Sequence, residues 1–284
     1  VTPENVQGLD CSSYEASGVA AYEEAFSFIR APESTEMAHL STPGVLASDH
    51  KPVVDEARLL CNNREDCVYT FQVAHANESV ADIVDVKDAV SGGSFVAAYH
   101  TWFDDNADWL IPLGDLVPAV YAQNDNAATP AKAPAGRNRG RIPSVAVEEV
   151  FTDSEQRQLH DNNINFATTR RGFIAVVGQH TLRPQGAFSQ LNVRRGVNFI
   201  KLEAQSAARD LLFEPNTTQN QQELENAIET ALEPLSQQGG VNEFEVNVTG
   251  QRNEMEGSIS LSFQDVIDRI IIDFSVRRNQ IVFV

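Results

Sequence analysis

The spacing of apolar residues changes once in the second half of the chain, and this change constrains the fold more than any other feature. In residues 193–211 and 224–232, apolar side chains recur every three or four positions, which is typical of amphipathic helices. In residues 244–263 they alternate with polar ones, as in antiparallel strands with one buried face. Two helices followed by such strands predict an α+β unit in which helices pack on a mainly antiparallel sheet.

The first half alternates strand-like and helix-like segments. The strand-like segments, rich in β-branched and aromatic residues, are 37–40, 67–74 and 95–103. The helix-like segments are 52–61, 79–90 and 115–126. This order predicts an α/β layer. Beyond it, Thr152 and Glu155 form a capping-box pattern that predicts a short helix, and residues 164–169 and 173–177 are predicted strands.

Residues 127–143 are predicted to be a loop at a domain border, because Pro, Ala, Gly and four basic residues occur there without apolar periodicity. We therefore predict an outer α/β domain over residues 1–143 and a C-terminal α+β domain over residues 144–284. The alternative is a basic RNA-binding arm, which is the weaker interpretation because the segment lacks interleaved aromatic residues.

Negative charge is concentrated in the first part of the chain. Residues 1–130 contain 21 acidic and 5 basic side chains, a net charge of −16, whereas residues 131–284 contain 19 and 16, a net charge of −3. The total of −19 disfavours direct nucleic-acid binding, because an acidic surface repels phosphate. The split predicts that the first part faces solvent and that the second part is suited to contacts.

Motifs for catalysis or metal binding are absent from the sequence. There is no G-x-S-x-G, no G-x-x-x-x-G-K-[ST], no H-E-x-x-H and no C-x-x-C. Ser94 and His100 would stand about 20 Å apart on one extended strand, too far for a nucleophile and its base. The six histidines lack the spacing of metal ligands. We predict no catalytic residues, no metal and no cofactor.

The cysteine content and the hydropathy of the sequence predict the cellular compartment of the protein and whether it inserts into a membrane. Three cysteines, an odd number, argue against a disulfide framework and favour a reducing, cytosolic origin. No leader with a basic start and an apolar core is visible at the beginning of the sequence. The apolar run at residues 173–177 is far shorter than the roughly 18 residues of a membrane-spanning helix. We predict no membrane insertion.

The sequence ends on four consecutive apolar residues, Ile281, Val282, Phe283 and Val284. Such a segment would fray or aggregate unless it paired with the edge of a sheet. Two possibilities stay open at this point. The segment pairs inside its own domain, or it adds a strand to a sheet of a neighbouring subunit, with backbone hydrogen bonds supplying the affinity.

Several short segments together resemble one protein family. They are 152–156 (TDSEQ), 163–165 (NIN), 178–182 (GQHTL), 192–195 (NVRR) and 213–216 (FEPN). In order and spacing they resemble the C-terminal domain of contractile phage tail sheath proteins, a family that includes the sheaths of R-type pyocins and, more distantly, of type VI secretion systems. Upstream, 99–102 (YHTW), 120–122 (VYA) and 132–135 (KAPA) extend the resemblance, which covers residues 37–284. Gly136 and Pro118 depart from the residues more usual in the family.

The resemblance implies a structural subunit and not an enzyme. It implies copies stacked as six-fold rings around an inner tail tube, contracting to drive the tube through the host envelope. The implied partners are the chain itself, the tube protein, and baseplate and tail terminator proteins. The implied location is the virion tail, assembled in the host cytoplasm. The competing prediction is a monomeric α/β enzyme or small-molecule binding domain whose site is built from residues distant in sequence.

Candidate contact residues follow from the resemblance and from charge. Arg194 and Arg195 resemble the paired arginines of the family and would contact another subunit or the tube; the alternative is local pairing with a carboxylate such as Glu214. Arg170 and Arg171 fall on a predicted hairpin tip and would touch a neighbour or the tube; a solvated turn is the alternative.

The last candidates lie on the second predicted helix of the C-terminal unit. Glu223, Glu225 and Glu229 share a polar face that could meet a basic strip on the tube. A plain solvated face is the alternative. The strand of Ile281, Val282, Phe283 and Val284 completes the set of predicted inter-subunit contacts.

Overall fold

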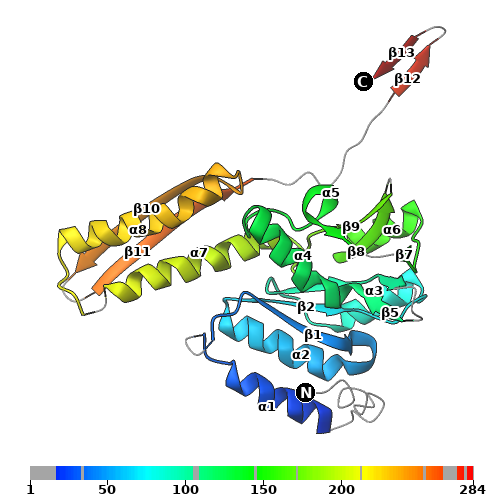
Figure 1. The fold of residues 1–284 in the computed structure, drawn as a ribbon, viewed down its shortest axis with the longest axis horizontal. Coiled ribbons are helices and arrows are strands. Elements are labelled where there is room, and N and C mark those ends of the chain that lie inside the picture. Colours follow the sequence, from blue (N-terminus) through cyan, green and yellow to red (C-terminus); the bar gives the residue numbers. More distant parts are fainter. Residues whose placement is uncertain are drawn as a thin grey trace.

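The computed structural model divides into a large α/β body, an elongated lobe and a small C-terminal hairpin (Figure 1). It describes residues 17–32, 35–104, 109–143, 146–170, 172–211, 213–251, 254–264, 274–277 and 280–283. Across these ranges, none of the helices has the length and apolar character needed to cross a bilayer.

A six-stranded sheet forms the centre of the body, with the strand order β1-β2-β3-β8-β9-β6. Its strands are β1 (His39–Leu46), β2 (Val68–Gln72), β3 (Val96–Tyr99), β8 (Ile164–Arg170), β9 (Phe173–Val177) and β6 (Arg141–Ile142). The strands from β1 to β8 run parallel, whereas β9 is antiparallel to both β8 and β6. The predicted α/β layer is confirmed.

Helices cover both faces of this sheet. Side chains along each strand point alternately to the two faces, so both faces have apolar residues to bury. Tyr69 and Phe71 of β2 belong to one apolar core, and Val68 belongs to the other. The helices of the body are α1 (Ser17–Phe28), α2 (Ala47–Arg64), α3 (Val80–Ala89), α4 (Leu113–Ala127), α5 (Gly136–Arg139) and α6 (Asp153–Asp161). The first core packs against α2, and the second packs against α4. The sheet is thereby buried on both sides.

The strand predicted over residues 95–103 is wrong as a single element. After β3 the chain turns at His100 and Thr101 and enters a separate three-stranded sheet of order β5-β4-β7. That sheet contains β4 (Trp102–Asp104), β5 (Leu110–Pro112) and β7 (Ala146–Val147). Thr101 fixes the turn, because its Oγ1 accepts a hydrogen bond of 3.0 Å from the amide of Ala167 in β8.

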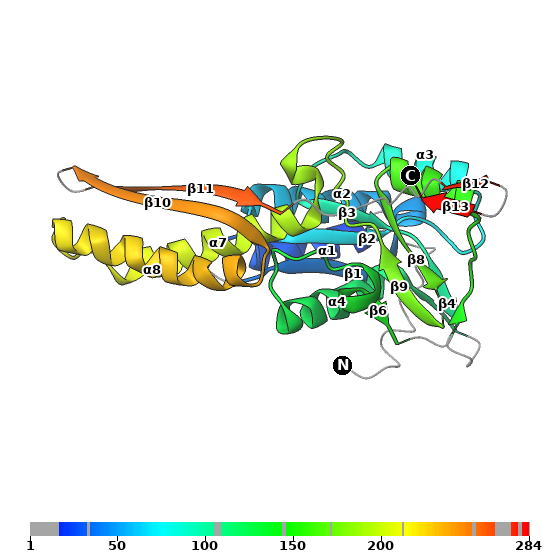
Figure 2. The same cartoon turned by 90° about the horizontal axis from the view of Figure 1, so that it is seen from above.

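The lobe is the predicted α+β unit. Its elements are α7 (Leu191–Asp210), α8 (Thr218–Gln237), β10 (Val241–Gln251) and β11 (Glu254–Phe263), and a short 3-10 turn, η4 (Ala187–Ser189), precedes α7. The two strands pair as one long antiparallel hairpin. Figure 2 shows both helices on the same side of that hairpin. Leu224, Ile228 and Leu232 of α8 pack against Val246 and Val248 of β10 in a third apolar core.

The six-stranded sheet crosses the boundary predicted at residues 143/144. β8 and β9 follow that position, yet Ile164 and Phe166 of β8 are buried in the same core as Tyr69. The separate core of the lobe includes residues from α7 onward. Pro, Ala, Gly and basic residues without apolar periodicity predict a loop at a domain border in 127–143, whereas the end of this segment is strand β6 of the six-stranded sheet.

The border segment 127–143 is a packed connection between body and lobe. Ala131 is buried in the core of the lobe. Lys132 donates a hydrogen bond to the carbonyl of Gly239, and Arg139 Nε donates one of 2.9 Å to the carbonyl of Ala133. The guanidinium of Arg137 lies 5.3 Å from the centre of the Phe173 ring. The basic side chains therefore hold the chain's own elements together.

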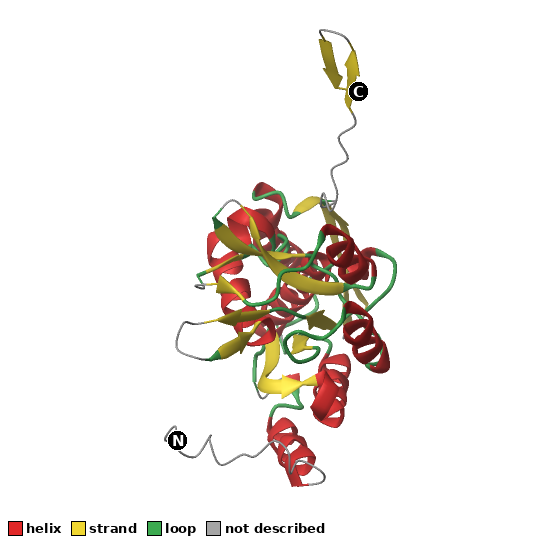
Figure 3. Cartoon of the chain, turned by 90° about the vertical axis from the view of Figure 1, so that its right-hand side faces the viewer, coloured by secondary structure: helices red, strands yellow, loops and turns green. Residues whose placement is uncertain are grey.

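The C-terminal hairpin pairs only with itself among the described strands. Its strands are β12 (Phe274–Arg277) and β13 (Gln280–Phe283), and they form a separate antiparallel sheet. Figure 3 shows this hairpin well away from the body. The predicted strand of residues 281–284 is a strand as far as Phe283, and Val284 lies outside the described residues.

Candidate functional site

The base of the lobe is fixed to the body through Arg195, one turn into α7. Its Nη2 lies 2.6 Å from Oδ2 of Asp125, and its guanidinium carbon lies 4.1 Å from the centre of the Tyr121 ring. Both partners are on α4, and the side chain of Arg195 is only 5% exposed. A buried guanidinium needs such partners, because its charge has left water. The pair therefore ties α7 to α4.

Arg194, the neighbouring residue, is held by aromatic rings instead of a carboxylate. Its guanidinium carbon lies 4.0 Å from the ring centre of Phe95 and 3.8 Å from that of Phe188. Its Nη2 donates a hydrogen bond of 2.8 Å to Ser94 Oγ. Burial is the largest influence and lowers the pKa of Arg194 to about 10, so the group stays charged at neutral pH. Cation–π contacts stabilise a charge in this position.

The structure therefore places both arginines inside the chain and on no exposed face. Arg195 does form the ion pair within the chain that the alternative predicts, but its partner is Asp125. Glu214, the partner suggested from the sequence, is exposed. The sequence pattern does not predict the pairing of Asp125 with Arg195, because the two residues are 70 positions apart. The hairpin tip predicted at Arg170 exists between β8 and β9, while Arg171 lies outside the described residues.

The predicted acidic face of α8 is solvent-facing. Glu223 is exposed, and Glu225 and Glu229 are partly exposed. Within the described ranges no ion pair joins them to another residue. The buried stripe of the helix, which includes Leu224 and Ile228, packs into the core of the lobe. Glu223 lies on one side of this stripe, and Glu225 and Glu229 lie on the other. These glutamates are therefore accessible to a partner, and their contact with the tube stays a prediction.

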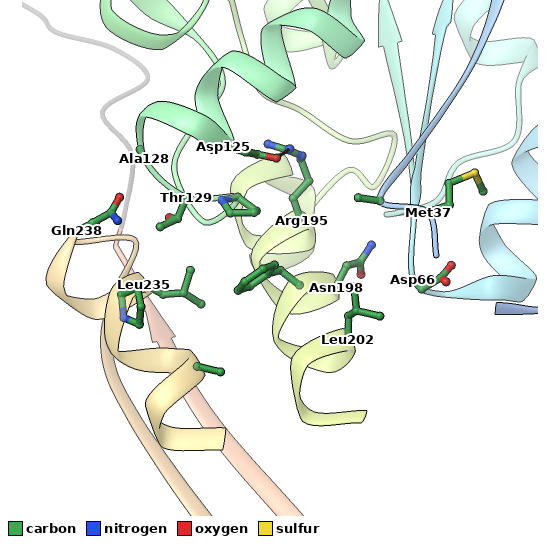
Figure 4. Close-up of a pocket in the computed structure, with 15 residues that line it drawn as sticks. Met37, Asp66, Asp125, Ala128, Thr129, Arg195, Asn198, Leu202, Leu235 and Gln238 are labelled. Carbon is green, nitrogen blue, oxygen red and sulfur yellow. Dashed lines mark hydrogen bonds and ion pairs between the residues drawn. The ribbon is translucent and has the colours of Figure 1, made fainter. Parts of the chain in front are cut away.

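A cavity of about 390 Å³ lies where the base of the lobe meets the body (Figure 4), and we call it the junction cavity. Its walls come from α7, the C-terminal end of α8, the segment 128–130, Met37, Ala38 and two aspartates. The apolar lining comprises Met37, Ala38, Ala128, Pro130, Phe199, Leu202, Ala231, Pro234 and Leu235. The polar lining comprises Asp66, Asp125, Thr129, Arg195, Asn198 and Gln238. Sequence reasoning missed this cavity.

Titratable side chains elsewhere form small internal contacts. His100 Nε2 lies 3.2 Å from Glu149 Oε2, and the Nε2 atoms of His160 and His180 lie 3.1 Å apart. Cys61 and Cys67 are free and buried. Among the described residues no group of three or more His, Cys, Asp or Glu side chains gathers at a spacing that could hold a metal ion.

His39, beside the junction of α4 and β1, makes stability depend on pH. Its Nε2 lies 2.7 Å from Thr70 Oγ1 and its ring centre 4.9 Å from that of Tyr121. Burial, and to a smaller extent the charge of Arg195, lower the pKa of His39 to about 3. The unfolded chain therefore binds a proton below about pH 6.5 that the folded chain does not bind.

We expect the free energy of unfolding to fall as pH decreases from about 6.5 towards 3, by at most about 1.4 kcal/mol per pH unit from this single proton. Urea unfolding at several pH values measures this slope. The variant His39→Gln should reduce the slope, whereas His75→Gln, at an exposed position, should leave the contribution of His39 in place. An unchanged slope in His39→Gln would contradict the assignment.

Comparison with known proteins relates these features to a family. No family model matches the chain. The tail sheath protein of Vibrio phage KVP40 is 29% identical over 210 residues, which are 69% of this chain. The tail sheath protein of Enterobacteria phage T4 is 27% identical over 161 residues, or 56% of this chain. The chain is therefore similar in sequence to the tail sheath proteins of two phages.

The fold of the chain agrees with this sequence similarity. It resembles the solved PVC sheath complex of an extracellular contractile injection system, in its contracted state, with a TM-score of 0.74 and 23% identity, over 86% of this chain and 72% of that one. The chain spans 31% of the length of the Vibrio phage protein and 24% of that of the T4 protein. It thus corresponds to about a quarter to a third of the curated relatives that it matches.

Proposed function

We propose that the chain is a structural subunit of a contractile tail sheath. Copies would assemble as stacked six-fold rings around an inner tube and would contract to drive the tube through the host envelope. The observation that carries this proposal is the sequence match over 210 residues to a tail sheath protein. The fold shared with a contracted sheath complex supports it.

The proposal includes partners and a location. Beyond other copies of itself, the chain would bind the inner tube protein, the baseplate and the tail terminator, and it would reside in the virion tail after assembly in the host cytoplasm. It would use no cofactor and would transform no substrate. Contraction of this kind requires subunits that move as bodies, and a body and a lobe with separate apolar cores suit such movement.

Backbone pairing would supply most of the affinity between copies. An exposed ion pair contributes only about 0–1 kcal/mol, so contacts through Arg170, Arg171 or the α8 glutamates would be weak individually and effective through repetition. We propose that the strand of Ile281, Val282, Phe283 and Val284 joins a sheet shared with a neighbouring copy. The hairpin of β12 and β13 supports this, because it pairs with no other described strand.

Negative-stain electron microscopy of the purified chain tests the proposed function. We expect rings, rods or long polysheaths whose amount grows with protein concentration. Isolated globules at high concentration, combined with a melting temperature that rises on adding a small ligand, would instead support the monomeric enzyme or binding domain. A matched sample at high salt separates the two contributions to assembly, because salt screens exposed charge pairs and not backbone pairing.

A further inference from the structure

Cys61 and Cys67 bring their sulfur atoms into contact in the core of the body. Sγ of Cys67 lies 3.2 Å from Sγ of Cys61, and the two residues are six positions apart in the sequence. Cys61 lies in the last turn of α2, and Cys67 directly precedes β2. Both side chains are buried and are free thiols. A disulfide bond of about 2 Å therefore requires the two sulfurs to approach by only about 1 Å.

The segment between the two cysteines is anchored through Arg64, which fixes both ends of the pair. The side chain of Arg64 is 0% exposed, and its Nη2 lies 2.7 Å from Oδ2 of Asp66. The guanidinium also donates hydrogen bonds to the carbonyls of Ile29, Ala31 and Thr35, which precede β1. Because these contacts hold the end of α2 and the start of β2 together, the fold itself keeps the two sulfurs close.

We propose that Cys61 and Cys67 are a modification site at which the two thiols are oxidised to an intramolecular disulfide by a peroxide. One thiolate attacks an oxygen of the peroxide, the O–O bond breaks, hydroxide leaves, and the sulfur becomes a sulfenic acid. The second thiolate attacks that sulfur, which forms the S–S bond and releases a second hydroxide. The two protons lost by the thiols convert both hydroxides to water. Two electrons thus pass from the two sulfurs to one peroxide molecule.

The oxidant reaches this buried pair through the surface segment that joins the two cysteines. Asn63 and Glu65 in this segment are exposed, and Glu65 has a φ of 58°, in the left-handed region. Local opening of such a surface turn requires less free energy than unfolding of the core, and a peroxide is small enough to enter through it. The hydrogen bond with Cys67 and burial raise the pKa of Cys61, so the reactive thiolate is scarce at neutral pH and oxidation is slow there.

The site suits a protein that is made in one redox compartment and used in another. Under the proposed function, the chain assembles in a reducing cytoplasm, where the thiols persist, and the particle later meets oxidising surroundings. The joining segment also contacts the lobe, since Nζ of Lys201 in α7 lies 3.7 Å from Oε2 of Glu65 and Asp66 lines the junction cavity. The disulfide would stiffen the part of the body next to the lobe. This role rests on the proposed function, whereas the oxidation itself does not.

Peptide mapping of the intact, folded chain tests the site. Trypsin cleaves after Arg58, Arg64 and Lys87, which places the two cysteines in the separate peptides 59–64 and 65–87. The chain is exposed to hydrogen peroxide at mildly alkaline pH, and the remaining thiols are then alkylated before digestion. We expect the two peptides to stay linked without reductant and to separate after treatment with dithiothreitol. The melting temperature of the oxidised chain should rise by about 5 °C, because the bond closes a short loop in the unfolded state.

Two controls make the result decisive. The third thiol, Cys11, reports how much oxidant the chain has received, because it has no part in the proposed bond. Separate peptides 59–64 and 65–87 in a chain whose Cys11 is fully oxidised would overturn the site. The variant Cys67→Ala, exposed to peroxide in the same way, should show no linked peptides and no rise in melting temperature. An equal rise in that variant would contradict the disulfide as the cause of the stabilisation.

Neither measurement requires assembly, so the two proposals fail separately. Unlinked peptides would leave the sheath function intact. A chain that forms no rings or rods in the electron microscope, but yields the linked peptides, would overturn the proposed function and retain the disulfide site.

Discussion

Deletion of residues 281–284 is expected to leave a folded chain that no longer polymerises. β13 pairs only with β12 among the described strands, and it belongs neither to the six-stranded sheet nor to the β10–β11 hairpin. The described members of the three apolar cores all precede position 264, and we expect the deletion to leave these cores folded. It removes the backbone groups that we propose are shared with a neighbouring copy. Circular dichroism melting reports the fold, and sedimentation together with negative-stain microscopy reports assembly.

A matched variant distinguishes backbone pairing from side-chain burial. Replacing Ile281, Val282 and Phe283 with threonine keeps the strand propensity and every backbone donor and acceptor. If backbone hydrogen bonds supply the affinity, this variant polymerises at a higher concentration, whereas the deletion variant does not polymerise. Normal polymerisation of the deletion variant would refute the shared strand.

Local sequence rules predicted the elements of the lobe and the start of α6 in the body well, because each of these features depends on neighbours in the chain. Apolar residues at 193–211 predicted α7, which the structure places at Leu191–Asp210. The Thr152 and Glu155 capping box is present with both of its hydrogen bonds. Alternation in 244–263 predicted the β10–β11 hairpin. Helix period, caps and strand alternation all act over fewer than about ten residues.

Pairings between distant segments could not be predicted in the same way. β8 lies next to β3 although more than 60 residues separate them, and no local pattern specifies that neighbour. The sequence also did not predict the split of residues 95–103 into two strands, because His100 and Thr101, which separate the strands, are neither Gly nor Pro. Thr101 stabilises that turn through a hydrogen bond to β8, which only the assembled sheet provides.

The candidate site shows the same limit. The resemblance identified Arg194 and Arg195 as a pair, but their partners Asp125 and Phe95 come from segments 70 and about 100 residues away. A buried arginine pairs with the carboxylate or aromatic ring that the fold places next to it, and that neighbour can come from any part of the sequence. The junction cavity likewise forms where the lobe meets the body, from residues distant in sequence, and no sequence motif marks it.

The second large effect is expected at the ion pair between α4 and α7, in which Arg195 is buried and Asp125 is 32% exposed. In the variant Asp125→Ala, the guanidinium of Arg195 stays in a position where its side chain is 5% exposed, and it loses its carboxylate partner. Removing one partner costs about 3–5 kcal/mol in a fully buried pair and about 0–1 kcal/mol in an exposed one, so we expect a loss of about 2 kcal/mol in free energy of unfolding for this half-exposed carboxylate. The Tyr121 ring still contacts the guanidinium, but it compensates for only part of this cost. Urea unfolding followed by circular dichroism measures the loss.

The double variant Asp125→Ala, Arg195→Met determines whether the uncompensated charge is the cause. Methionine keeps most of the apolar stem of Arg195 and removes the charge, so we expect the double variant to recover most of the stability that Asp125→Ala loses. If both variants are equally destabilised, the loss comes from packing against α4. If Asp125→Ala costs less than about 1 kcal/mol, the pair behaves like an exposed one, and the lobe is held to the body mainly by the sandwich of Arg194 between Phe95 and Phe188.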